Sequence, residues 1–260
     1  MVSLFADIAF LTRSEHRVCA LIAMAARPRS RSELGEITGA SASTIRRTLS
    51  DFEDRNWIER DGYQYQATEL GSFIATGMTD LLERFETERQ VRSVWEWLPE
   101  SMDDFSLDMC GTPTVTIATA EDPYRPVSRF GSLLESADRL RFTGFDVAVL
   151  EPTRSTLCER ICEGMKAELI APPRVVRYVR NTYPEAFQDP LESGNLTIQV
   201  HEDLPSYGVA VFDQQAAIVC YDVDGVMVRV LLEGTGEAFV DWAQSVFDRY
   251  DREIPTIAID

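Results

Sequence analysis

The sequence predicts an α+β fold: a small N-terminal helical module, a long linker helix and a C-terminal mixed α/β domain. Three observations predict it. Short helical patterns precede an Asp61-Gly62 hairpin signal. A single helical pattern then continues to about residue 98, and beyond residue 112 strand patterns alternate with helical ones. We therefore expect three segments: 1–68, 69–99 and 100–260.

The first two helices of the module are expected over residues 14–25 and 32–39. The second follows a basic turn, with Ser32 as its N-cap and Gly39 just beyond its last turn. Residues 1–13 are expected to add a helix that packs on the module or on a partner subunit. Along the 14–25 helix, apolar residues recur at helical spacing at Val18, Leu21, Ile22 and Ala25.

The next helix has the pattern of a recognition helix. Ile45, Leu49 and Phe52 recur at helical spacing and face inward. Helix, helix, turn, helix and hairpin in this order are typical of a winged helix-turn-helix, a DNA-binding module. We assign the recognition helix to 42–55 and the wing to 57–68. The outward face of the helix carries Ser43, Thr44, Arg46, Arg47 and Ser50.

Arg46 and Arg47 can each donate two hydrogen bonds to guanine O6 and N7. The alternative is a solvated helix face, paired with Asp51, Glu53 or Asp54; within this array we favour DNA contact. Tyr63 and Tyr65 alternate with Gln64, so one face of that strand is expected to serve packing. The other residues expected to contact DNA are Arg29, Arg31, Ser41, Ser43, Thr44, Arg60, Tyr63 and Tyr65.

Charge is distributed unevenly along the chain. Residues 1–68 contain nine acidic residues and nine arginines, whereas 69–260 contain 34 acidic and 16 basic residues and carry the whole net charge of −18. Such a charge normally argues against nucleic-acid binding, but the module itself is neutral. Lys166 is the only lysine, against 24 arginines. This composition favours a halophilic protein; an acidic mesophilic protein with GC-rich codons is the alternative.

The chain has no run of 18 apolar residues and no signal-peptide pattern, so we expect a cytoplasmic protein with no membrane partner. Its five cysteines are scattered and odd in number, unlike a disulfide framework. Cys158 and Cys162 share a helix face, as in a redox pair or half a metal site. Because no histidine flanks them, buried core cysteines are favoured. We expect no metal and no cofactor.

The linker helix is expected to run from Thr68 to about Leu98, to end at Pro99 and to support dimerisation. Residues 100–112 are polar and irregular, as at a domain boundary. Further on we expect helices over 125–137, 155–165, 173–183 and 236–253, and strands over 113–120, 139–149 (one or two), 167–172, 196–202, 207–213, 216–222 and 227–233.

The C-terminal half carries a P-x-G-V-x-x-x-D…D-x-D-G pattern followed by a helix that contains a tryptophan. In these features it resembles the effector domain of archaeal regulators of the methanogenesis-regulatory (filament-regulator) type, and distantly that of TrmB-type repressors. The resemblance implies a one-component transcription regulator. The residues that carry it are Pro205, Gly208, Val209, Asp213, Asp222, Asp224, Gly225 and Trp242.

The TrmB-type effector fold in turn resembles phospholipase-D-like domains, whose chemistry needs a His-x-Lys pair. In this chain His201 is followed by Glu202 and Asp203, so that activity is not supported. The other histidine, His16, lies in the N-terminal module, so a shared catalytic site is not expected.

Four residues are candidates for effector binding. Arg174, Arg177 and Arg180 stand at i, i+3 and i+6 of one helix, either as an anion-binding stripe or, as we favour, neutralising nearby carboxylates. A polar-lined pocket would favour ligand sensing; a filled core would favour a ligand-free platform. The candidates are Thr143, Arg174, Arg177 and Tyr207.

The sequence therefore predicts a transcriptional regulator that binds double-stranded DNA as a homodimer and responds to a small-molecule effector. Two alternatives stay open: an enzyme with an accessory DNA-binding module, and a ligand-free dimerisation domain carrying that module. Residues 113–260 show no nucleophile–base pair, metal cluster or cofactor loop, so no catalytic residue is assigned.

Overall fold

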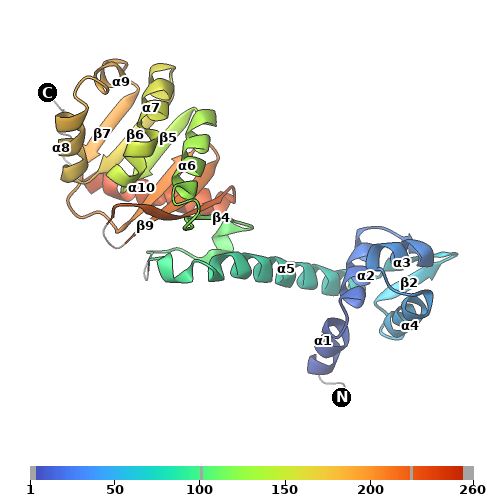
Figure 1. The fold of residues 1–260 in the computed structure, drawn as a ribbon. Helices are drawn as coiled ribbons and strands as arrows, with labels where there is room; N and C mark the ends of the chain where they lie inside the picture. Colours follow the sequence, from blue (N-terminus) through green and yellow to red (C-terminus); the bar gives the residue numbers. More distant parts are fainter. Residues whose placement is uncertain (1–3, 100–101, 223–224, 254–260) are drawn as a thin grey trace. The chain divides into compact units, whose positions relative to one another are not determined.

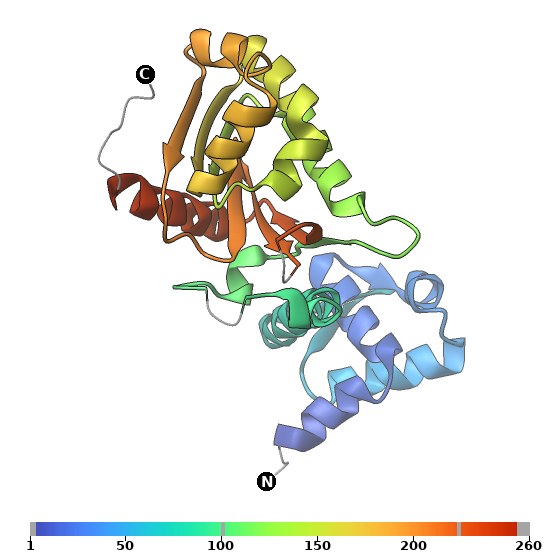
Figure 2. The same ribbon diagram turned by 60° about the vertical axis from the view of Figure 1, so that its left-hand side comes forward.

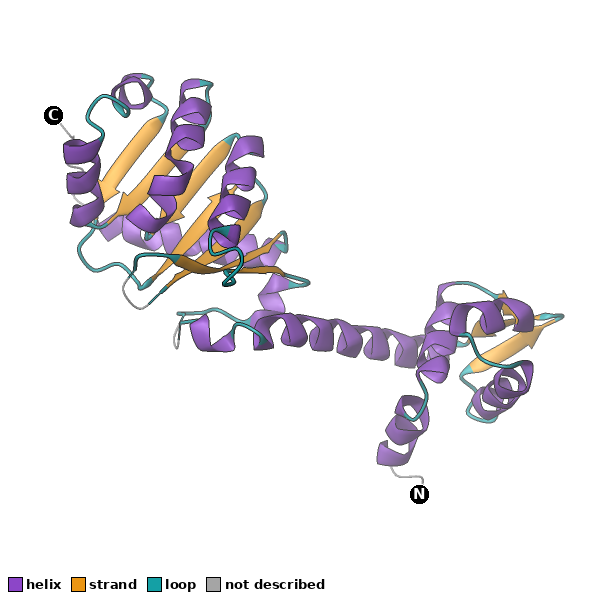
Figure 3. Ribbon diagram, in the orientation of Figure 1, coloured by secondary structure: helices purple, strands orange, loops and turns teal. Residues whose placement is uncertain are grey.

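The computed structural model describes residues 4–99, 102–222 and 225–253 (Figure 1). The chain divides into two compact units, Met1–Phe85 and Glu86–Asp260. The division falls within helix α5 (Glu69–Arg92), so the expected linker helix contributes residues to both units. The α+β class expected from the sequence is confirmed, as the helices and strands of Figure 3 show.

The N-terminal unit has the element order of a winged helix-turn-helix. Four helices precede a β-hairpin, and a two-residue strand that the sequence did not reveal joins the hairpin in an antiparallel sheet of order β1-β3-β2. The elements before α5 are α1 (Leu4–Thr12), α2 (Glu15–Ala26), β1 (Arg29–Ser30), α3 (Arg31–Thr38), α4 (Ala42–Glu53), β2 (Ile58–Asp61) and β3 (Gln64–Ala67).

One apolar core holds this unit together. Ile45, Leu49 and Phe52 of α4 are buried against Leu21 of α2 and Leu34 of α3, so the expected inward face of α4 is confirmed. Burial of one such side chain stabilises the fold by about 1.5–3 kcal/mol. The core therefore fixes which face of α4 points to solvent.

Helix α3 begins at a different cap from the expected one. Ser30 is the N-cap: its Oγ accepts a hydrogen bond from the Glu33 amide (3.3 Å), and its own amide donates to the Glu33 carboxylate (2.8 Å). The assignment to Ser32 was wrong because a capping box needs an acidic or amide residue three positions on, and Gly35 stands there. Gly39 ends the helix with φ +67°, as expected.

Close backbone contacts define the wing and the start of α5. The hairpin turns at Gly62-Tyr63, one residue later than expected, because Asp61 still pairs with Gln64. The Thr68 amide donates to the Trp57 carbonyl (2.9 Å). A Cβ at position 71 would lie 1.8 Å from that same carbonyl oxygen, so glycine is required there.

The C-terminal unit is built on a seven-stranded sheet of order β4-β10-β9-β8-β5-β6-β7. Strands β5, β6 and β7 are parallel, and the other neighbours are antiparallel. The strands are β4 (Thr114–Ile117), β5 (Arg139–Thr143), β6 (Lys166–Ala171), β7 (Leu196–Val200), β8 (Tyr207–Phe212), β9 (Gln215–Tyr221) and β10 (Val228–Gly234).

Helices cover both faces of this sheet. Figures 1 and 2 show α6, α7 and α8 on one face and α10 on the other. Phe130 and Phe142 lie in the core of the first face, Phe239 and Trp242 in that of the second. The helices are α6 (Arg125–Ser136), α7 (Val147–Cys162), α8 (Pro173–Thr182), α9 (Gln188–Glu192) and α10 (Glu237–Glu253), with 3-10 turns at Trp95–Trp97 and Leu107–Cys110.

Two stretches differ from expectation. The second strand allowed within 139–149 is wrong: Gly144 turns the chain with φ +78°, and Asp146 caps α7, its carboxylate accepting from the Val147 amide (2.6 Å). The segment after residue 101 packs within the C-terminal unit, because Trp242 Nε1 donates to the Asp103 carbonyl (3.0 Å) and Cys110 is buried.

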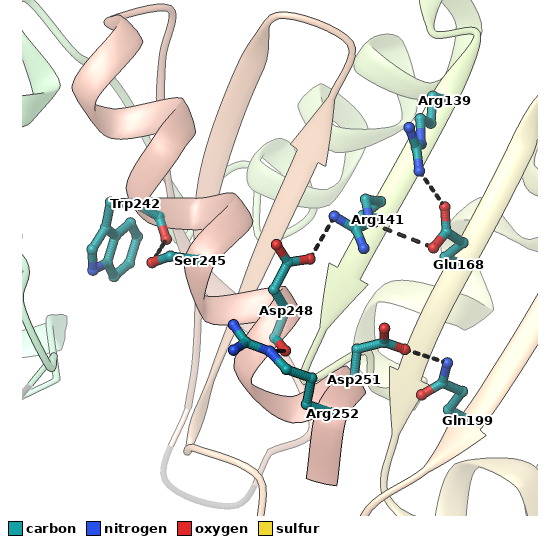
Figure 4. Close-up of polar contacts among 9 residues, drawn as sticks. All are labelled: Arg139, Arg141, Glu168, Gln199, Trp242, Ser245, Asp248, Asp251 and Arg252. Carbon is teal, nitrogen blue, oxygen red and sulfur yellow. Dashed lines mark hydrogen bonds and ion pairs between the residues drawn. The ribbon is translucent and has the colours of Figure 1, made fainter. Parts of the chain in front are cut away.

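Polar contacts fasten the last turns of α10 to the parallel strands (Figure 4). Arg141 of β5 pairs with Asp248 of α10 (2.8 Å) and with Glu168 of β6 (3.5 Å). Gln199 of β7 donates to Asp251 (2.6 Å). The second half of α10 is therefore held by these polar contacts as well as by the buried ring of Phe247.

Candidate functional site

The outward face of α4 is polar and exposed. Because Ile45, Leu49 and Phe52 fill the core together with Thr48, the opposite face of the helix points to solvent. The exposed face expected from the sequence is confirmed; it comprises Ser43, Thr44, Arg46, Arg47 and Ser50.

The two arginines of this face have no partner among the residues that the structure describes. Within the described chain, neither Arg46 nor Arg47 forms an ion pair or a side-chain hydrogen bond. Asp51, one of their alternative partners, lies 3.6 Å from Arg17 instead. Both guanidinium groups therefore keep all their donors available for a planar, bidentate acceptor.

Three hydroxyl groups gather at the N-terminal end of α4. Ser41 is the N-cap and accepts a hydrogen bond from the Thr44 amide (3.3 Å). Its Oγ also lies 2.9 Å from Ser43 Oγ and 3.0 Å from Thr44 Oγ1. All three residues are exposed. The positive end of the helix dipole at this point attracts anions such as a phosphate.

The wing presents only part of the expected set. Tyr63 is 88% exposed at the hairpin turn, and Arg60 is exposed, its Nε donating to the Gly62 carbonyl (2.8 Å). Tyr65 is 2% exposed, so the expectation that it contacts DNA directly is wrong. Position 65 lies on the strand face that packs on the helices, in keeping with the alternation along β3.

Tyr65 instead positions two arginines. Arg31 Nε donates to its hydroxyl (3.0 Å). The guanidinium carbons of Arg31 and Arg60 lie 5.5 Å and 5.7 Å from its ring centroid, within cation–π range. The sequence did not reveal this role, because it depends on β3 lying between β1 and β2 in the sheet.

Arg29 and Arg31 have different environments. Arg29 is half-buried: its Nε donates to the Ala23 carbonyl (3.4 Å), and its Nη1 lies 3.7 Å from the Glu33 carboxylate. Arg29 is thus tied to the module itself, whereas Arg31 is exposed. Of the two expected phosphate contacts, only Arg31 is presented to solvent.

The expected effector residues do not line one pocket. Thr143 is fully buried and alternates with Phe142, whose ring lies on the α6–α8 face, so Thr143 points to the α10 face. Tyr207 is buried on the α10 face, and burial raises the pKa of its hydroxyl. Arg174 and Arg177 belong to α8, on the opposite face.

The three arginines of α8 differ in whether they are paired. Arg174 pairs with the buried carboxylate of Asp146, as local neutralisation predicts. Arg177 and Arg180 are exposed and form no ion pair within residues 4–99, 102–222 and 225–253.

The remaining sequence candidates offer no site. Cys158 is half-buried, and burial raises its thiol pKa to about 11. Cys162 is exposed, so the core role expected for it is wrong. The described residues hold no group of three or more His, Cys, Asp or Glu able to bind a metal. No helix among them is both long and apolar enough to cross a membrane.

Two protein-family models match the chain. The model described as "Methanogenesis regulatory protein FilR1, middle domain" matches residues 123–253. The model described as "HVO_A0261 N-terminal domain" matches residues 5–90. The first match covers half of the chain and confirms the resemblance seen in the sequence. No curated protein sequence matches the chain.

Similar solved structures are distant. The archaeal chromatin protein TrmBL2 is 10% identical over 93% of this chain and 94% of its own, with a TM-score of 0.44. The phospholipase D family member Nuc from Salmonella typhimurium is 12% identical over 54% of this chain and 93% of its own (TM-score 0.37). NucT from Helicobacter pylori is 11% identical over 54% and 95% (TM-score 0.38). All three TM-scores are below 0.5, too low to support an inference about function.

Proposed function

The chain belongs to the family of the methanogenesis regulatory protein FilR1, a DNA-binding transcriptional regulator, and we propose that it binds operator DNA as a homodimer through α4 and the wing. The observation that carries the proposal is the pair of exposed arginines on α4, which form no ion pair with any described residue. They lie in a module of zero net charge within a chain of net charge −18. Family membership also favours a regulator over an enzyme.

The chemistry of the exposed face fits the major groove. Arg46 and Arg47 supply bidentate donors for guanine, and Ser43 supplies a hydroxyl for a base edge or a phosphate. Arg60 and Tyr63 of the wing reach the flanking backbone or the minor groove, and Arg31 meets phosphate. A two-fold dimer would read half-sites about 34–36 Å apart, one turn of DNA.

The dimer is proposed from an unpartnered apolar stripe. Phe73 of α5 is 78% exposed, and further exposed apolar side chains, among them Leu81 and Phe85, follow it along the helix. A Cβ at Gly77 would meet no atom within 4 Å, so a second helix can approach closely there. Exposed apolar groups of this extent mark interfaces. The exposed apolar residues of α1 and α5 are Phe5, Ile8, Leu70, Phe73, Leu81, Leu82 and Phe85.

A groove beside the stripe also suits a helix of a second copy. It has a volume of about 710 Å³ and lies between α1 and the start of α5, lined by Ile8, Leu11, Phe73 and Met78. Seating the stripe of a second copy there would cover both surfaces at once.

Selection of binding sites from random double-stranded DNA tests operator binding. We expect the wild-type chain to enrich a palindromic motif with half-sites one helical turn apart, and Arg46→Ala/Arg47→Ala to enrich none. The matched control, Arg177→Ala/Arg180→Ala, removes the same charge from α8 and should enrich the wild-type motif. An unchanged motif from the α4 variant would contradict the proposal.

Light scattering after size exclusion tests the dimer. Phe73→Glu places a charge in the stripe and should yield a monomer, because the buried charge would lack a partner. Leu191→Glu, at an exposed apolar residue of α9, is the control and should remain dimeric. A dimeric Phe73→Glu chain, or a monomeric wild type, would count against the α5 interface.

We also propose that a small molecule bound to the C-terminal unit modulates DNA binding. A one-component regulator needs a ligand site, and the sheet of this unit offers a pocket at the carboxyl ends of its parallel strands.

A further inference from the structure

A pocket of about 520 Å³ opens at the carboxyl ends of β5 and β6. Its walls come from the first turns of α7 and α8, the start of α6 and the segment before β10. Strand β5 has parallel β6 on one side and antiparallel β8 on the other, so the direction of the sheet changes at this point. Open α/β sheets bind ligands in crevices outside the carboxyl ends of their parallel strands, and this pocket has the usual volume of a ligand site.

The carboxylates of the pocket are already satisfied. Asp146 accepts hydrogen bonds from the Val147 amide (2.6 Å) and from Arg174. Glu151 accepts from the hydroxyls of Tyr178 (2.6 Å) and Tyr183 (3.0 Å). The Tyr178 contact raises the pKa of that hydroxyl to about 12, so it stays protonated as the donor. A cationic ligand would therefore have to displace existing bonds.

The groups of the pocket that can still bind a ligand are hydrogen-bond donors. Arg174 uses only Nη2 on Asp146, and its side chain is 62% exposed, so its other N–H groups are open to the pocket. The amide of Ala148 in the first turn of α7 donates no hydrogen bond within the described chain. A guanidinium beside a helix N-terminus favours an anionic acceptor.

The charge balance limits the ligand to one negative charge. Asp146 already neutralises much of Arg174, and Glu151 adds a negative charge to the same pocket. The surrounding segment 69–260 holds 34 acidic against 16 basic residues, so a dianionic phosphate would be repelled. The rest of the wall is apolar, including Tyr124, Val127 and Met227.

We propose that this pocket binds a small monocarboxylate with an apolar body, its carboxylate on Arg174 and the Ala148 amide and its body against Tyr124 and Val127. As a regulatory site the pocket rests on the proposed function. As a binding site it stands on its own.

Calorimetric titration of the full chain without DNA tests the site with four matched probes. Phenylacetate should bind saturably. Neutral phenylacetamide, cationic phenethylamine and dianionic benzylphosphonate should bind at least tenfold more weakly. Arg174→Gln should weaken phenylacetate at least tenfold, whereas Arg177→Gln, at an exposed arginine of the same helix outside the pocket, should not change its affinity.

Arg174→Gln leaves Asp146 without its partner, so a loss of binding in this variant could also result from misfolding. A second variant excludes that explanation. Ala148→Leu keeps the Arg174–Asp146 pair and fills the pocket, so it should abolish binding in a folded chain. The proposal is overturned by no saturable binding of phenylacetate, by tighter binding of another probe, or by unchanged affinity in Ala148→Leu.

Operator affinity, measured with and without phenylacetate, separates this proposal from the proposed function. Phenylacetate that changes operator affinity in the wild type but not in Ala148→Leu supports both. Binding of phenylacetate with no change in operator affinity supports the pocket and overturns its regulatory role. Loss of the operator selection alone overturns the proposed function and leaves the pocket standing.

Discussion

Helices α4 and α8 both present arginines to solvent, yet in opposite settings. Arg46 and Arg47 of α4 pair with none of the described residues, and they lie in a segment where acidic and basic residues balance. On α8, Arg174 is engaged by a buried carboxylate, and Arg177 and Arg180 lie in a segment with twice as many acids as bases. Among the described residues Arg177 and Arg180 form no ion pair either, so unpaired donors alone do not distinguish the two helices; the charge of the surrounding segment does.

The largest expected difference between the two helices is in DNA affinity. Arg46→Ala and Arg47→Ala should each weaken binding to the selected operator ten- to hundredfold, about 1–3 kcal/mol per bidentate contact. Arg177→Ala and Arg180→Ala should change it by less than about twofold, since they lie outside the DNA-binding module. Fluorescence anisotropy at one fixed salt concentration measures this, and equal losses from both helices would erase the distinction.

The second difference is in stability. Arg174→Gln removes the partner of Asp146, whose side chain is 8% exposed, and should destabilise the C-terminal unit by about 1–2 kcal/mol. The value is below that of a fully buried pair because Arg174 is largely exposed. Arg46→Gln removes no partner and should change stability by less than about 0.5 kcal/mol. Urea unfolding measures both changes. An equally large loss of stability for Arg46→Gln would show that Arg46 has a partner in the folded chain.

A smaller effect on stability is expected at the N-terminus of α3, the helix that precedes α4. Ser30→Ala should cost about 1 kcal/mol and Ser32→Ala only a few tenths, because Ser30 is the N-cap. The Ser30 hydrogen bonds lower the pKa of Glu33. The hydrogen bonds of the ionised Glu33 carboxylate therefore stabilise the fold fully above the pKa that Glu33 has in the unfolded chain. This contribution is lost as the pH falls through the lower pKa that Glu33 has in the folded chain. The Ser30→Ala difference should narrow in acid; a larger cost for Ser32→Ala would restore Ser32 as the cap.

The smallest expected effect concerns the Tyr65 hydroxyl. Tyr65→Phe keeps the buried ring but removes the hydrogen bond to Arg31, so operator affinity should fall about two- to threefold, or about 0.5 kcal/mol, with little change in stability. In a double-mutant cycle with Arg31→Ala the two effects should not add. Full additivity would mean that Tyr65 does not position Arg31.

Much of the N-terminal unit could be predicted because its information is local. The 3.6-residue period placed Ile45, Leu49 and Phe52 inward, and Gly39 marked the end of α3. Strand β1 could not be predicted, because two residues become a strand only through pairing with β3. The burial of Tyr65 likewise depends on which face of the hairpin meets the helices.

The C-terminal unit shows where local patterns fail. Val147-Ala148-Val149 reads as a strand, but the cap at Asp146 and the turn at Gly144 make it the start of α7. Thr143 and Tyr207 were grouped with α8 by chemistry, yet a sheet separates them from that helix. The pocket beside Arg174 joins segments far apart in sequence, so only the fold reveals it.

The central claim is that α4 directs this chain to specific DNA sites. Genome-wide occupancy of the tagged chain, compared in living cells with Arg46→Ala/Arg47→Ala, tests it most directly. We predict discrete peaks that contain the selected motif in the wild type, their loss in the α4 variant, and their retention in Arg177→Ala/Arg180→Ala. Peaks that persist in the α4 variant, or no wild-type peaks across several growth conditions, would contradict the claim.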